Sequence, residues 1–147
     1  MNDNDFLDKK LKIVKQFNSL ILSIFKNLLS KEKDINLETV FNRIKQVKNT
    51  DECLLLEESH EKFWEIKDHI LTSDEEYFLN SNNYISHIPN EIKKNKDEFN
   101  SILELTNLIG SKYKSLSKKE RKKIWLILQK MFLQVVEYKE LINDYIN

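Results

Sequence analysis

The C-terminal segment Ser117–Asn147 reads SKKERKKIWLILQKMFLQVVEYKELINDYIN and decides the fold class. Its apolar residues recur at alternating steps of four and three, as one face of a helix requires. This face consists of Ile124, Leu128, Met131, Val135, Tyr138, Ile142 and Tyr145. Further apolar side chains fill the other faces between Ile124 and Tyr138, so we expect other helices to surround this one. Ser117 and Glu120 form a capping box that predicts where the helix begins.

The composition extends this prediction to the whole chain. The 147 residues suit one domain. Gly and Pro occur once each and Ala is absent, which favours helices that are joined by short polar connections and packed through large side chains. We predict an all-α fold with a single domain over residues 1–147, a bundle of five to six helices around a buried C-terminal helix.

Apolar periodicity and capping residues predict the remaining helices. They are expected at about residues 5–30, 36–47, 51–71, 73–79 and 89–110. Asn36 is a suitable N-cap for the second helix, and Ser73 with Glu76 forms another capping box. Pro89 suits the first turn of a helix, and Gly110 suits the residue that ends it.

Charge, cysteine content and apolar run length indicate the cellular setting. The 24 basic and 24 acidic residues balance, so no net field draws the chain to nucleic acid or to a membrane. Cys53 is the only cysteine, which excludes an internal disulfide and fits a reducing compartment. The N-terminus MNDNDF lacks the order of a secretory signal, and Gln129, Lys130 and Gln134 interrupt the C-terminal apolar run before the ~20 residues of a membrane span. We expect a cytoplasmic protein without a transmembrane segment.

The strongest candidate binding surface is a basic segment at residues 112–130. Its cations are Lys112, Lys114, Lys118, Lys119, Arg121, Lys122, Lys123 and Lys130. Cations in the first turn of a helix oppose its dipole, so a phosphate, an acidic protein or an anionic lipid is a reasonable ligand. A solvated loop is the plainer interpretation, because Arg and interleaved aromatic residues, which mark nucleic-acid binding, are scarce here.

A second stretch of the chain carries the opposite charge to this basic segment. Residues 51–76 contain ten acids and only two bases, Lys62 and Lys67. If the two stretches face each other within one chain or between subunits, each satisfies the other without a further ligand. We predict such pairing in preference to nucleic-acid binding.

No catalytic or metal-binding pattern stands out. Glu57 and His60 have the E-x-x-H spacing of carboxylate-bridged metal sites in helical bundles, but a second copy is absent, so they are better interpreted as surface residues. Cys53 lies in an apolar run and is more simply a small buried residue than a reactive thiolate. A chain with one Gly cannot build a phosphate-binding glycine loop. We predict no enzyme activity, no cofactor and no metal.

Trp64 and Trp125 are the two tryptophans of the chain, and both fall at helical positions. The simpler prediction is that they anchor the core, and the sharper one is that they anchor a protein interface. Their burial decides between the two.

The segment Ser117–Phe132, SKKERKKIWLILQKMF, resembles a recurring end segment of small helical proteins from large cytoplasmic DNA viruses. Ile124-Trp125 and Leu128-Gln129 match that pattern after a charged turn. Ile127 stands where an aromatic residue is common, and an upstream Pro-Gly-Ile segment is absent. The resemblance implies a viral origin, a non-enzymatic role and, for some of these proteins, a place in the virion.

These features together predict a non-enzymatic protein that binds other proteins or further copies of itself, as a virion or assembly component in the host cytoplasm or the virion. The alternative from a different class is a nucleic-acid- or phosphate-binding accessory protein that uses residues 112–130. A third hypothesis is a host-interaction module of the kind that poxviruses build on a Bcl-2-like fold, although the Asn-Trp-Gly-Arg signature of cellular Bcl-2 proteins is absent.

Overall fold

The protein is an all-α bundle in the part of the chain that a computed structural model describes, residues 1–30, 34–80, 83, 90 and 94–147. The helices are α1 (Asp3–Leu28), α2 (Ile35–Thr50), α3 (Leu54–Glu65), α4 (Lys67–Leu71), α5 (Glu75–Leu79), α8 (Lys96–Ser115) and α9 (Lys118–Ile146). The predicted all-α class is therefore confirmed. The predicted helix at residues 51–71 is divided at Ile66 into α3 and α4. Pro89 lies outside the described residues.

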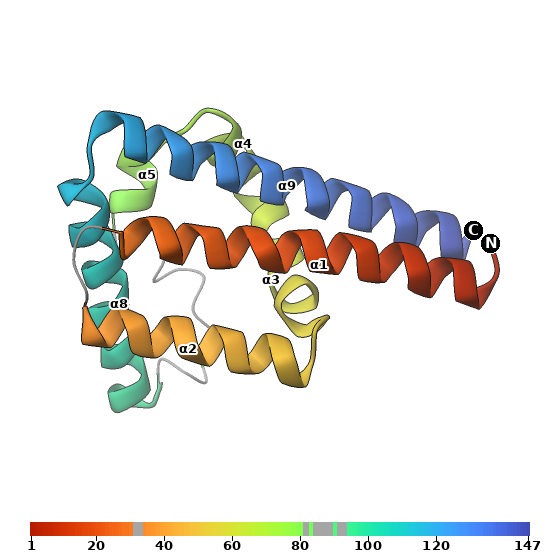
Figure 1. The fold of residues 1–147 in the computed structure, drawn as a ribbon, viewed down its shortest axis with the longest axis horizontal. Coiled ribbons are helices and arrows are strands. Elements are labelled where there is room, and N and C mark those ends of the chain that lie inside the picture. Colours follow the sequence, from red (N-terminus) through yellow and green to blue (C-terminus); the bar gives the residue numbers. More distant parts are fainter. Residues whose placement is uncertain (31–33, 81–82, 84–89, 91–93) are drawn as a thin grey trace.

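The two longest helices, α1 and α9, lie side by side and antiparallel, so the two ends of the chain meet at one end of the bundle (Figure 1). Their facing stripes form one apolar core cluster together with Leu56 of α3. Its members from α1 and α9 are Ile13, Val14, Phe17, Met131, Val135, Tyr138 and Leu141. The helical spacing of apolar residues in the two segments produces these matching stripes.

The other helices cover the remaining sides of this pair. α2 lies along α1 on the side away from α9, and α8 stands across the far end of the bundle (Figure 1). A second core cluster fills the junction of α1, α2, α8 and α9. Its buried members are Phe25, Leu28, Leu37, Phe41, Tyr113, Leu116 and Ile124. Ile21, Ile24 and Leu128 pack against both clusters, so the end of the bundle that α8 closes is continuous with the middle of the α1–α9 pair.

α9 is buried along most of its length but not on every face. Seven of its residues are buried, whereas the side chains of Leu126 and Leu133 are 49% and 57% exposed. The prediction that other helices surround it is thus wrong for this stripe, because α1, α3 and α4 pack against other faces of the helix. None of the described helices, α9 included, has a stretch long and apolar enough to cross a membrane.

Four of the described helices, α1, α2, α5 and α9, begin at a side-chain cap, and two of these caps differ from prediction. Ser117 accepts a hydrogen bond from the Glu120 backbone N–H at 3.2 Å, as the capping box predicts. α2 is capped by Asp34, whose carboxylate accepts from two backbone N–H groups, so Asn36 is not the cap. α5 is capped by Asp74 in place of Ser73. Ser73 has a φ of 52°, a left-handed conformation that an N-cap residue does not adopt.

Gly110 lies inside α8 and does not end the helix. α8 continues to Ser115, and the glycine does not have a positive φ. The prediction of a glycine C-cap is therefore wrong at this position. The reason is that a lone Gly can sit within a helix when the flanking residues favour it, at a cost of about 1 kcal/mol relative to Ala.

We predict that Gly110→Ala stabilises the protein. A Cβ atom at this position lies 3.8 Å from the Leu79 Cδ2 atom, which is an ordinary contact. Without a clash, the change removes the backbone entropy cost of a helical glycine, about 0.5–1 kcal/mol. Urea unfolding of the two proteins measures the difference. A destabilised variant would show that α5 and α8 approach more closely than this packing allows.

Candidate functional site

An apolar cavity of about 480 Å³ opens between α5, α8, α9 and the second half of α1. The helices converge here because α8 crosses the end of the bundle instead of running alongside it (Figure 1). The apolar residues in its wall are Ile24, Leu28, Phe78, Leu79, Ile109, Ile124, Trp125 and Leu128. Cavities of this size and character are typical of sites that take up a small ligand or the side chains of a partner.

Three polar side chains in the wall are joined by hydrogen bonds. The Trp125 indole N–H donates to the Tyr113 hydroxyl at 2.8 Å, and the Tyr113 hydroxyl donates to the Glu75 carboxylate. The Phe78 ring meets the Trp125 ring edge-on with centroids 5.2 Å apart. These contacts fix the orientation of the indole and of the phenol, so one side of the cavity is rigid and polar.

The link between α4 and α5 places Glu75 at this wall. Asp74 caps α5 by accepting from the Tyr77 backbone N–H, and its carboxylate lies 2.9 Å from His69 Nδ1. Two hydrogen bonds hold the pKa of Asp74 below its usual range. The larger effect comes from His69 and the smaller from the Tyr77 backbone N–H. Gln129 of α9 donates to the Ser73 hydroxyl and to a backbone carbonyl of α4, both at 3.2 Å. The left-handed turn at Ser73 is therefore attached to α9.

Tyr113 remains protonated at any physiological pH. Burial, reinforced by the hydrogen bond to Glu75, raises its pKa to about 12. The phenol is therefore a fixed hydrogen-bond donor toward Glu75 and an acceptor toward Trp125. Such a group positions its neighbours and does not exchange protons near pH 7.

The two tryptophans have different environments. Trp125 is 6% exposed and lies in the core and the cavity wall. Trp64 is 40% exposed, so it is not a core residue. Its ring stacks on Phe132 at 6.0 Å, and the ammonium groups of Lys67 and Lys139 lie 4.2 Å and 5.0 Å from its centroid. For Trp64 an interface role stays a prediction.

The predicted basic segment borders the cavity on one side. Lys114 lines the wall, and Arg121 lies over the Tyr113 ring at 5.3 Å while donating to the Lys114 carbonyl at 2.6 Å. Lys112 does not line the cavity, and its Nζ atom lies 3.9 Å from the Asp34 carboxylate. The remaining members of the segment are exposed: Lys118, Lys119, Lys122, Lys123 and Lys130.

The expected pairing with residues 51–76 is not seen within one chain. Across the described ranges, Lys118, Lys119, Lys122 and Lys123 form no ion pair with an acid of that stretch. The two regions are linked instead by the hydrogen bond from the Tyr113 hydroxyl to the Glu75 carboxylate and by those from Gln129 to Ser73 and to the α4 backbone. α3 and α4 pack on α9, but this packing does not pair the exposed lysines with the acids, which charge counting along the sequence does not reveal. Pairing between subunits stays a prediction.

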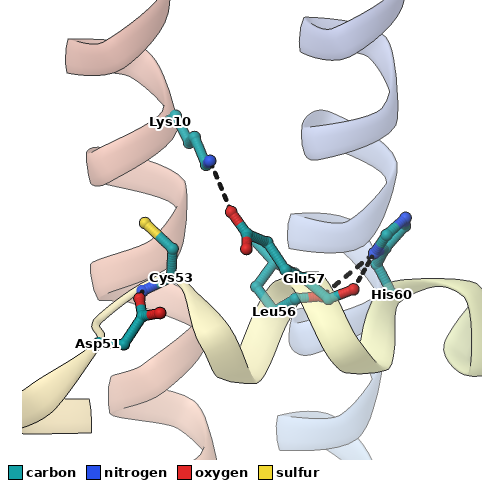
Figure 2. Close-up of polar contacts among 6 residues, drawn as sticks. All are labelled: Lys10, Asp51, Cys53, Leu56, Glu57 and His60. Carbon is teal, nitrogen blue, oxygen red and sulfur yellow. Dashed lines mark hydrogen bonds and ion pairs between the residues drawn. The ribbon is translucent and has the colours of Figure 1, made fainter.

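Glu57 and His60 point away from each other (Figure 2). The Glu57 carboxylate accepts from Lys10 at 2.6 Å, and this hydrogen bond raises the pKa of Lys10. His60 Nδ1 lies 2.9 Å from the Glu57 backbone carbonyl, in the first turn of α3. Burial raises the pKa of the nearby Cys53 thiol. In the described part of the chain, no three His, Cys, Asp or Glu residues are placed to hold a metal ion.

Sequence reasoning identifies few of the residues that shape the cavity. It singles out Trp125 and includes Lys114 in the basic segment, but it does not assign Glu75, Phe78 or Tyr113 to a site. Tyr113 and Glu75 are 38 positions apart, and neither carries a local signal of pairing. Comparison with protein-family models, curated proteins and solved structures gives no match to this chain. The function of the site is therefore inferred from the chemistry of its own residues.

We predict that Tyr113→Phe destabilises the protein by about 1–3 kcal/mol near neutral pH, since it leaves the buried Trp125 N–H without an acceptor. The raised pKa of Tyr113, about 12, adds a pH dependence. The Tyr113 hydroxyl contributes its full stabilisation below about pH 10, the pKa of this group in the unfolded chain. This stabilisation is lost as the pH rises through the pKa of Tyr113 in the folded protein. Denaturant unfolding at a series of pH values should show the gap between the two proteins narrowing above about pH 10. A constant gap would mean that Tyr113 titrates normally.

We also predict a large difference between the two tryptophans. Trp125→Ala should cost about 3–5 kcal/mol, because it empties a buried site. The matched change Trp64→Ala should cost much less, since that ring is 40% exposed. Thermal unfolding of both variants measures the contrast. Equal losses would mean that Trp64 is also enclosed.

Proposed function

We propose that this chain is a non-enzymatic, helical protein-binding protein that takes an apolar side chain of a partner into the cavity between α5, α8 and α9. The observation that carries the proposal is an apolar cavity of about 480 Å³ bordered by the basic segment. Buried pockets that accept one anchoring side chain provide most of the binding energy at many protein interfaces. The matching partner is an acidic segment with a large apolar residue.

Charge placement supports an acidic partner. Lys114 lines the cavity, and Lys118 and Lys122 lie on the same side of α9 as Trp125, by steps of four and three. Both α9 lysines are exposed and have no ion pair with the described residues. Carboxylates that flank the apolar anchor of a partner would meet these cations. Such rim charges mainly speed association and select the partner.

The chemistry of the wall supports binding over catalysis. Tyr113 keeps its proton at neutral pH because its pKa is about 12. Glu75 accepts the hydrogen bond of the Tyr113 hydroxyl, and Trp125 has only an N–H to donate. No His or Cys is among the described residues that line the cavity. General acid–base catalysis works best with groups whose pKa lies near the working pH.

The proposed setting is a virion or a viral assembly intermediate. The support is the resemblance of Ser117–Phe132 to the end segment of small helical viral proteins. Mass spectrometry of purified particles from the source organism tests this part independently of the cavity. Detection of the chain in particles is expected, and its absence from them would contradict the proposal.

We predict that selection from a random peptide library against the whole protein yields segments with one large apolar residue flanked by acids. In a Trp64→Phe background Trp125 is the only tryptophan, so its fluorescence reports occupation of the cavity. Lys118→Glu with Lys122→Glu should weaken binding about tenfold through repulsion of the acids. The control, Lys9→Glu with Lys12→Glu, makes the same charge change at exposed positions of α1 and should have little effect.

Two results would contradict the protein-binding proposal. One is selected peptides that bind without changing Trp125 fluorescence, which would place their site elsewhere. The other is tight, salt-steep binding of DNA or RNA, which would promote the second candidate function, phosphate recognition. That candidate is favoured by the exposure of Lys118, Lys119, Lys122 and Lys123 at the start of α9. Each mutation that removes a phosphate-binding cation would then lower the slope of log affinity against log salt by about 0.7–0.9.

A further inference from the structure

A regular stripe of exposed residues runs along the outer face of α9. Its members follow one another at steps of four and three, so they lie in line on the helix surface. The stripe consists of Lys119, Lys123, Leu126, Lys130, Leu133, Glu137 and Glu140, all exposed. Its residues are distinct from those that line the cavity beside Trp125.

Two exposed leucines stand on either side of Lys130 at the middle of the stripe. Leu126 and Leu133 are 49% and 57% exposed, and they lie two helical turns apart. Beside Leu133, a shallow groove of about 520 Å³ separates α9 from α1, with Leu20 in its wall. Lys130, between the two leucines, has a long alkyl stem that can cover apolar surface while its ammonium stays in water. The groove offers room for an additional leucine side chain.

The two ends of the stripe have opposite charge. Lys119 and Lys123 lie toward the start of α9, and Glu137 and Glu140 lie toward its end. None of the four forms an ion pair with a described residue, in contrast to Lys10 with Glu57. The charges are also separated by roughly 20–30 Å along the helix, too far to neutralise each other.

We propose that two copies of this chain associate through this stripe, with their α9 helices antiparallel. A two-fold axis near the middle brings Lys119 and Lys123 of each copy opposite Glu137 and Glu140 of the other. The leucines of each copy then meet the leucines and the α1–α9 groove of its partner. A parallel arrangement would align like charges along the whole length, which is unfavourable. The charge order of the stripe thus selects the antiparallel dimer.

The occupant is a second copy because the stripe is complementary to itself. A helix reversed end to end presents acid where this one presents base, and it places Leu126 opposite Leu133, with the two Lys130 side chains beside the two-fold axis. An unrelated acidic or basic partner would match only one half of the stripe. Helix pairs of this type are commonly set by charged residues that flank an apolar seam, with Leu as the contact residue.

Sedimentation equilibrium of the whole protein tests the dimer at about 0.05 M and about 0.5 M salt. We expect a dimer that weakens as salt rises. Leu126→Asp with Leu133→Asp should produce a monomer without unfolding, since both side chains are exposed. Lys119→Glu with Lys123→Glu should weaken the dimer by about tenfold or more, because acids then face acids. Circular dichroism of each variant checks that the fold is retained.

A quadruple variant provides the matched control. Adding Glu137→Lys and Glu140→Lys to the two lysine reversals restores the wild-type net charge and reverses the charges at both ends of the stripe. The antiparallel dimer should then return to near wild-type affinity. A wild-type protein that stays monomeric at low salt, a dimer indifferent to both sets of variants, or a quadruple variant that stays as weak as the double would each overturn the proposal.

Discussion

The antiparallel packing of α1 against α9 is the interaction on which the rest of the structure depends. Val14 and Phe17 of α1 and Val135 of α9 are fully enclosed at its centre. Burial of such side chains contributes about 1.5–3 kcal/mol each, and the seam repeats this along two long helices. Leu56 adds α3 to the same cluster. The short helices, which are marginal alone, gain their stability by packing on this pair.

α9 has three faces with different surroundings. One face packs on α1, a second receives α3 and α4 and carries Trp125 at the cavity, and a third is the exposed stripe through Leu126 and Leu133. The basic residues at its start divide in the same way: Lys118 and Lys122 lie on the cavity side, and Lys119 lies on the outer stripe. A single charged segment therefore presents cations on two faces, since residues four apart share a face and adjacent ones do not.

A few polar groups decide where the short elements lie. Gln129 holds the turn at Ser73, and this turn orients α5 so that Glu75 reaches the cavity wall. Asn18 of α1, which is fully buried, donates to the Glu52 carbonyl at 2.8 Å and fixes the junction of α2 and α3. Apolar contacts tolerate small shifts, whereas a buried donor that loses its acceptor costs free energy. These hydrogen bonds therefore give the short helices defined positions.

By itself the sequence determined the helical class, the course of the long helices and the cap at Ser117, because apolar spacing and capping chemistry act over a few neighbouring residues. Only the tertiary structure decided that Trp125 is buried and Trp64 is not, and that α9 leaves Leu126 exposed. Spacing shows that residues share a face but not which neighbour covers it. Likewise, the contact of Tyr113 with Glu75 depends on where α5 and α8 meet, which packing between distant segments sets.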